Sequence, residues 1–186
     1  AELGGGITTQ QWIVDAYLIT LGALILVAGS VSDAYGRVLV LRIGLIGFGI
    51  ASLAIAAAPT AEFLIIARGV QGATGAFLVP SSLALITSNF SGGAQSRAIG
   101  IWTAMTTSAM IVGPLLGGIL VDFASWRWAF LINVLPIGVT LVLLARGGFR
   151  DTRHPDASID WLGAALCTLG PGGMVYALLE QPVQSR

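Results

Sequence analysis

Long uncharged stretches alternate with short charged turns along the whole chain. Runs without Asp, Glu, Lys or Arg cover residues 16–32, 43–61, 69–96, 98–121, 128–145 and 161–179. Each run has about 17 residues or more, the length at which an apolar helix crosses the hydrocarbon core of a bilayer. The pattern predicts an all-α integral membrane protein, a polytopic helical bundle with six spanning helices.

Composition supports this fold class and narrows the function. The chain is 55% hydrophobic and 10% charged, whereas about a quarter of the residues of soluble domains are charged. Its formal net charge is zero, which argues against a nucleic-acid-binding surface. The sequence has no Ser/His/Asp constellation, phosphate-binding loop or metal-ligand cluster, so we expect neither an enzyme nor a bound cofactor or metal.

The arginines predict the orientation of the helices. Six of them lie in the turns around 33–42, 89–97 and 146–157, whereas Arg127 and Arg186 lie on the opposite side. The positive-inside rule places the first set in the cytoplasm and both ends of the chain outside a cell (inner or plasma) membrane. The opening AELGGGITTQ lacks the features of a signal peptide. We therefore expect a missing upstream helix and a longer parent protein.

Two polar residues near the start of the first run are candidate cavity residues. Asp15 lies just before the run and Tyr17 just inside it. An ionisable group at this depth lies either in water at the outer surface or toward a central cavity, where it can relay protons. The sequence leaves both positions of Asp15 open.

The turn after the first run reads GSVSDAYGR, from Gly29 to Arg37. Gly29 and Gly36 permit a tight turn and a close approach of two helices. Asp33 can cap the next helix or pair with a nearby arginine. Taken as physical chemistry alone, this is a compact helix–turn–helix connection.

Arg68 lies directly before the third run and is expected about 7 Å inside the membrane, counted from Phe63. Its side chain either extends outward to water or faces a water-lined cavity. We favour the cavity, because Gln71 lies one turn away on the same helix face.

The remainder of the third run predicts close packing and a kink. Pro80 should kink the helix, with Ser81 and Ser82 satisfying the freed backbone groups. A groove for a neighbouring helix is expected along three glycines spaced three residues apart, Gly69, Gly72 and Gly75.

Between Arg97 and Asp122 lie 24 uncharged residues with a distinctive pattern. Pro114 cannot donate to the carbonyl four residues back, so the helix should bend there. Two rows of small residues should let another helix come to backbone contact. These rows are Gly100, Ala104 and Ser108, and Ala109, Gly113 and Gly117, with Gly118 next to the last.

Two further polar side chains lie inside the apolar runs. Trp102 is either an interface anchor or a surface on which apolar cations stack, and we favour the anchor. Asn133, in the fifth run, is expected to form an interhelical hydrogen bond rather than to contact a ligand.

Several of these patterns resemble signatures of the major facilitator superfamily. The pattern G-x-x-x-D-x-x-G-R of residues 29–37 resembles the loop between the family's second and third helices, and L-x-x-x-R-x-x-Q-G of residues 64–72 resembles its fourth-helix signature. The glycines and proline of residues 100–118 resemble the fifth-helix signature of drug:proton antiporters. SWRWAFLINVLPIG, residues 125–138, resembles the sixth helix of their fourteen-helix branch.

The resemblance implies a partial major-facilitator fold that covers roughly helices two to seven. Residues 1–146 would form five helices of the N-terminal transporter bundle, without its first helix. Residues 147–160 would be a cytoplasmic loop, and 161–186 the extra central helix and an outer tail. The implied function is proton-coupled export of lipophilic or cationic drugs by alternating access. Its partners would be the lipid bilayer, protons, the small-molecule substrate and the remaining half of the transporter.

The physical arguments and the resemblance together give individual residues expected roles. Asp15 and Arg68 are expected to act in proton coupling. The other candidates form three sets: cavity residues Tyr17, Gln71, Trp102 and Asn133; a cytoplasmic gate of Gly29, Asp33, Gly36 and Arg37; and the antiporter helix with Gly100, Gly113, Pro114, Gly117 and Gly118. Two other functions stay open, a major-facilitator importer or uniporter of metabolites and a truncated, non-transporting membrane module.

Overall fold

A computed structural model describes residues 6–149 together with residues 166, 170 and 173. All regular secondary structure in this part of the chain is helical. The helices are α1 (Ile7–Tyr35), α2 (Arg37–Ala56), α3 (Ala61–Gly75), α4 (Leu78–Asn89), α5 (Gly92–Phe123), α6 (Trp128–Leu131) and α7 (Val134–Arg146).

Five helical stretches in the described residues are long and apolar enough to cross a membrane. They are α1, α2, α3 continued by α4, α5, and α6 continued by α7. These stretches coincide with the first five predicted runs, so that part of the prediction is confirmed. The sixth predicted span, 161–179, lies outside the described residues except for single positions, and so does most of the predicted loop 147–160.

Short connections separate the helices, and particular residues set two of them. Gly36 alone separates α1 from α2 and has a φ of 109°, a conformation that a residue with a Cβ rarely adopts. The tight turn predicted there is confirmed. At the start of α3, the Thr60 side chain accepts a hydrogen bond from the Phe63 backbone N–H at 3.2 Å, which caps the helix.

The third span is interrupted, but one turn earlier than predicted. Helix α3 ends at Gly75 and α4 begins at Leu78. Pro80 lies in the first turn of α4, where it has no N–H to offer the carbonyl four residues back, so the break falls on that side of the proline. Ser82 Oγ donates to the Val79 carbonyl at 2.9 Å, whereas Ser81 Oγ is buried without a hydrogen-bond partner among residues 6–149. The Ser82 hydroxyl thus bonds to a carbonyl other than the one that Pro80 leaves free, and among the described residues neither serine makes the predicted contact.

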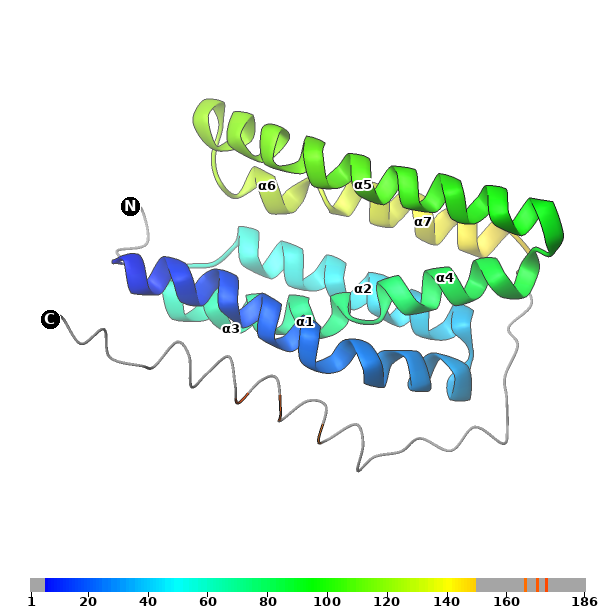
Figure 1. The fold of residues 1–186 in the computed structure, drawn as a ribbon. Helices are drawn as coiled ribbons and strands as arrows, with labels where there is room; N and C mark the ends of the chain where they lie inside the picture. The colour runs from blue at the N-terminus through cyan, green and yellow to red at the C-terminus, as the bar shows by residue number, and fades with distance from the viewer. Residues whose placement is uncertain (1–5, 150–165, 167–169, 171–172, 174–186) are drawn as a thin grey trace, which may run out of the picture.

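Helices α1 to α4 pack into one group (Figure 1), in which α3 contacts both α1 and α2. One hydrophobic cluster joins α2, α4 and α7 and contains Val38, Leu41, Leu45, Leu85 and Leu144. A second joins α2 and α3 through Ile55, Ala58, Leu64 and Ala67, with Ile13, Ala54, Trp126 and Phe130 packed against it. The spans are therefore fixed to one another at both ends of the bundle.

The close helix packing predicted along the glycines of the third span is confirmed at Gly72 and Gly75. A Cβ at Gly72 would meet the Tyr17 carbonyl and the Thr20 hydroxyl of α1. A Cβ at Gly75 would lie 3.3 Å from the Phe48 ring of α2. The missing side chains let α1 and α2 approach the backbone of α3 closely.

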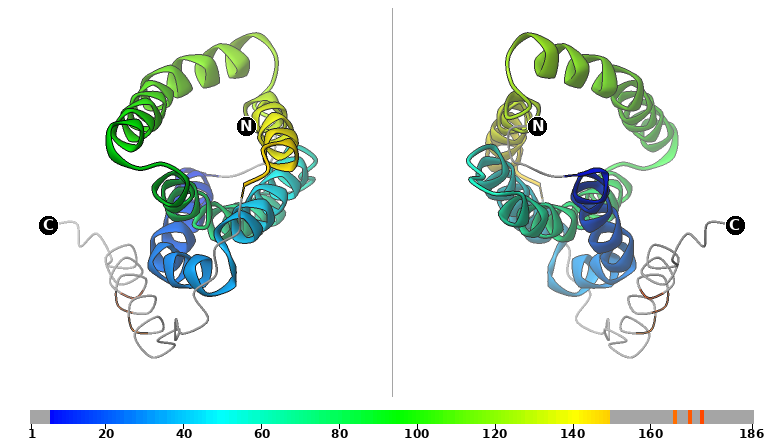
Figure 2. Two further views of the ribbon diagram at one scale, coloured as in Figure 1. Left: turned by 90° about the vertical axis from the view of Figure 1, so that its right-hand side faces the viewer. Right: turned by 90° about the vertical axis from the view of Figure 1, so that its left-hand side faces the viewer.

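Helix α5 stands apart from this group. It contacts α4 and α6, and Figure 2 shows it arching away from α1–α4, although it overlaps α7 in Figure 1. None of its residues is buried. The chain stays helical through Pro114, and the predicted bend there stays a prediction.

Candidate functional site

The guanidinium of Arg68 lies at the junction of three helices. Its Nε donates to the Ile13 carbonyl of α1 at 3.1 Å, and its Nη1 donates to Gln71 Oε1 at 2.7 Å. The side chain therefore turns toward the neighbouring helices rather than outward, whereas the water-lined cavity favoured in the sequence analysis stays a prediction. Because an arginine inside an apolar span is costly unless it is hydrogen-bonded, these contacts are what keep the charge there.

Two aromatic rings complete the surroundings of Arg68. Its Cζ lies 4.2 Å from the centre of the Tyr17 ring and 5.8 Å from that of Phe130. Both distances are within the range of cation–π attraction. Tyr17 was a candidate cavity residue, and it faces Arg68. Phe130 was missed, because nothing in its local sequence distinguishes it from other apolar residues of the fifth run.

Gln71 connects Arg68 to a third helix. Its side chain is 1% exposed, and its Nε2 donates to Ser52 Oγ of α2 at 2.8 Å. Ser52 is itself completely buried. It was also missed by the sequence analysis. The only available signal was a hydroxyl in an otherwise apolar run, and most such hydroxyls bond to their own helix.

Asp15 is not part of this junction. Ile13 and Tyr17, which contact Arg68, are one turn apart on α1, and Asp15 lies about 200° around the helix from either, at 3.6 residues per turn. Within the described residues the one ion pair joins Asp33 and Arg37. Asp15 and Arg68, the two residues expected to act in proton coupling, therefore do not form an ion pair with each other in this structure.

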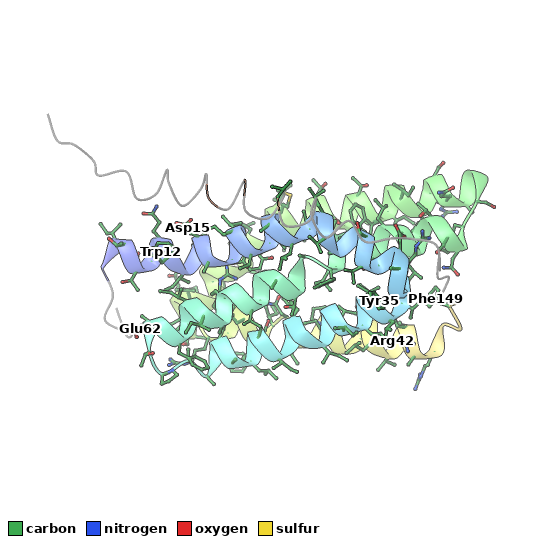
Figure 3. All side chains as sticks on the ribbon, turned by 90° about the horizontal axis from the view of Figure 1, so that it is seen from below. Trp12, Asp15, Tyr35, Arg42, Glu62 and Phe149 are labelled. Atoms are coloured by element: carbon green, nitrogen blue, oxygen red, sulfur yellow. The ribbon has the colours of Figure 1, made fainter. Side chains whose placement is uncertain are left out.

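The opposite end of the bundle holds the candidate cytoplasmic gate. Figure 3 places Tyr35, Arg42 and Phe149 at this end and Trp12, Asp15 and Glu62 at the other. The gate residues Asp33 and Arg37 belong to α1 and α2, on the two sides of the Gly36 turn.

Two arginines of α2 hold the neighbouring helix ends at this side. Arg37 Nη2 lies 3.0 Å from Asp33 Oδ1, and its Nη1 donates to the Ala84 carbonyl of α4 at 3.1 Å. Arg42 Nη2 donates to the Leu144 carbonyl, near the end of α7, at 2.9 Å. A cation at a helix C-terminus also interacts favourably with the helix dipole. The sequence analysis gave Arg42 no role.

The other predicted gate and cavity residues differ in their surroundings. A Cβ at Gly29 would lie 4.0 Å from Pro80, so α1 and α4 pass close together there. Trp102 Nε1 donates to Ser82 Oγ at 3.2 Å, which makes it a link between α5 and α4. The side chain of Asn133 has no hydrogen-bond partner among the described residues, so the predicted interhelical bond does not form within them.

The glycines of α5 have no neighbour within the described chain. A Cβ added at any of them would meet nothing within 4 Å, and this holds for Gly100, Gly113, Gly117 and Gly118. The predicted backbone contact with another helix is therefore not made by any described residue. These positions are open to a partner surface.

The described helices are linked by arginine contacts at both ends of the bundle. Among the described residues no three His, Cys, Asp or Glu side chains gather as a metal site. What the bundle does contain is a partly buried cation, Arg68, near one end of an apolar span and arginine bridges between helices at the other end.

Comparison with known proteins gives the same family as the motifs. The family model described as Major Facilitator Superfamily matches residues 1–174. A puromycin resistance protein of Streptomyces alboniger is 38% identical over 181 residues, which are 96% of this chain and 36% of that protein.

Two further relatives are a multidrug efflux pump and a second antibiotic resistance protein. The pump, from Mycolicibacterium smegmatis, is 41% identical over 80% of this chain and 30% of its own length. A methylenomycin A resistance protein of Bacillus subtilis is 34% identical over 92% of this chain and 37% of its own. The chain thus spans about a third of the length of the curated relatives it matches. With its apolar spans and this family match, it is a multi-pass membrane protein and belongs to the Major Facilitator Superfamily.

Proposed function

We propose that the chain forms part of the N-terminal bundle of a secondary transporter that exports lipophilic or cationic drugs in exchange for protons. The relatives named as resistance proteins and as an efflux pump support this substrate class. The observation that carries the proposal is Arg68, a charge held inside an apolar span by neutral groups of α1, α3 and α6. No enzymatic step is part of it.

A fixed cation in this position supplies what proton coupling requires. Its field lowers the cost of an ionised carboxylate nearby and raises the cost of a second cation, such as a charged drug. Binding of a proton neutralises the carboxylate and removes its attraction to the arginine. The inward-open and outward-open conformations then change in relative stability. Coupling thus needs no chemical reaction, only a charge whose position is fixed.

Asp15 keeps a role in this proposal as a proton-binding group on the other face of α1. Since Arg68 bonds to the Ile13 carbonyl of the same helix, a shift of α1 on protonation of Asp15 would displace the contact of Arg68. The coupling would then run through the helix as a rigid unit rather than through an ion pair.

The cytoplasmic side carries Arg37 and Arg42, and both ends of the chain lie outside.

Transport measurements on the complete transporter test the proposal. It is reconstituted into vesicles, and movement of a fluorescent lipophilic cation such as ethidium is followed under an imposed pH gradient. We expect gradient-driven transport that Arg68→Ala abolishes and Asp15→Asn reduces. Trp12→Phe, close by on α1, serves as a control that should leave it intact.

Three outcomes would contradict the proposal. Undiminished gradient-driven transport in both Arg68→Ala and Asp15→Asn would remove the coupling mechanism. Transport by the wild-type protein that ignores the pH gradient would favour a uniporter instead, and complete inactivity toward the probe and toward metabolites would favour the non-transporting module.

A further inference from the structure

The amide of Gln71 can point in only one direction. A guanidinium has hydrogen-bond donors and no acceptor, so the group of Gln71 that faces Arg68 Nη1 at 2.7 Å must be its carbonyl oxygen. The amide nitrogen then faces Ser52 Oγ at 2.8 Å and donates to it. Chemistry therefore fixes this chain of hydrogen bonds from Arg68 through Gln71 to Ser52.

Ser52 is a fixed point for this chain because helix packing fixes its backbone. A Cβ added at Gly44 of α2 would lie 3.2 Å from the Thr74 carbonyl of α3, and one added at Gly47 would overlap the Thr74 side chain. The two helices therefore pack in close contact one to two turns before Ser52. Ser52 is 0% exposed, and its short side chain has little freedom of its own.

Arg68 is consequently held from two sides. Its Nε is bound to the backbone of α1 at Ile13, and its Nη1 is bound through Gln71 to α2. If the α2 contact is lost, the buried amide nitrogen of Gln71 has no acceptor, and such a group gains free energy by turning toward another one. The carbonyl oxygen then leaves Arg68, and the guanidinium keeps one protein contact fewer.

We propose that Ser52 is a positioning residue for Arg68, which it holds in place through the amide of Gln71. It does not touch proton or substrate itself. The inference rests on the proposed function for its consequence, the coupling of transport to the proton gradient. The hydrogen-bond chain itself does not depend on that function, so the two can be tested separately.

The chain offers a matched control for Ser52. Ser81 is also 0% exposed, but its hydroxyl has no hydrogen-bond partner in the described part of the chain. Ser52→Ala and Ser81→Ala thus remove the same oxygen from equally buried positions, and only the first removes an acceptor. Ser52→Thr keeps an oxygen at the same place.

The first measurement compares two modes of transport in vesicles containing the complete transporter. Ser52→Ala should lower ethidium transport driven by a pH gradient about threefold to tenfold, the range expected for one buried hydrogen bond between neutral groups. Ethidium exchange at equal pH on both sides should be unchanged, because it needs no proton coupling. Ser52→Thr should restore the driven transport, and Ser81→Ala should match the wild type. An equal loss of both modes in Ser52→Ala would make Ser52 merely structural and overturn the inference.

The second measurement is independent of transport. In the purified transporter, Ser52→Ala should lower the Tm of the wild type but not the Tm of Gln71→Leu, in which the amide has already been removed. Equal Tm losses in both backgrounds would show that Ser52 does not act through Gln71. If wild-type transport proves independent of the pH gradient, the proposed function fails. The comparison of Tm losses in the wild-type and Gln71→Leu backgrounds still decides whether the hydrogen-bond chain exists.

Discussion

Replacement of Gly72 by alanine should separate α1 from α3 and thereby disturb Arg68. A Cβ at Gly72 would lie under 3.0 Å from the Thr20 hydroxyl and from the Tyr17 carbonyl oxygen. The hydroxyl can rotate away, but the carbonyl belongs to the backbone of α1, so the helix itself must move. Ile13, whose carbonyl binds Arg68 Nε at 3.1 Å, lies one turn before Tyr17 on the same face of α1.

The magnitude follows from comparison with Gly69, one turn earlier on α3. A Cβ there would meet only the Thr20 methyl, at 3.9 Å. Both substitutions gain about 0.5–1 kcal/mol because alanine is the better helix former. Gly72→Ala alone carries an overpacking cost of about 1–3 kcal/mol. The loss of the charged hydrogen bond to Ile13 adds about 1.5–3 kcal/mol if it breaks.

The assay measures the free energy of unfolding of both variants of the purified transporter in mixed micelles, together with gradient-driven transport. Gly69→Ala should be as stable as the wild type or more so and should transport normally. Gly72→Ala should be less stable than Gly69→Ala by about 1–3 kcal/mol from overpacking, and by more if the Arg68 contact is lost, and its transport should fall. Equal stability of the two variants would refute the close helix approach on which the reasoning depends.

Two further predictions concern the other features of the bundle. Arg42→Ala removes the hydrogen bond to the Leu144 carbonyl and should lower the free energy of unfolding by about 1.5–3 kcal/mol. Arg146→Ala, at an exposed position at the end of α7, should change the free energy of unfolding little. Equal losses in the two variants would contradict the assigned contact of Arg42. Gly113→Leu should leave membrane insertion and stability of residues 6–149 intact, since a Cβ there meets nothing within 4 Å, but should reduce gradient-driven transport in the complete transporter. Loss of insertion in a protease-protection assay would show that Gly113 packs within the described bundle after all.

The sequence alone determined where the described helices lie. Charge is costly inside a bilayer, so the charge-free runs mark the spans directly. The turn at Gly36 and the groove along Gly69, Gly72 and Gly75 were also readable, because glycine spacing reflects local geometry. The pairing of Asp33 with Arg37 could also be predicted from the sequence, since the two residues are only four positions apart.

Only the tertiary structure decided which distant groups meet at Arg68. Ser52 and Phe130 come from other spans, and no local pattern marks a serine or a phenylalanine in an apolar helix as a partner of a given arginine. The position of Asp15 was ambiguous for a related reason. Periodicity places it on one face of α1, but only the packing of α3 against Ile13 and Tyr17 reveals that this face is turned away from Arg68. The position and length of each helix depend on the local sequence, whereas the contacts between helices depend on how the helices rotate and cross.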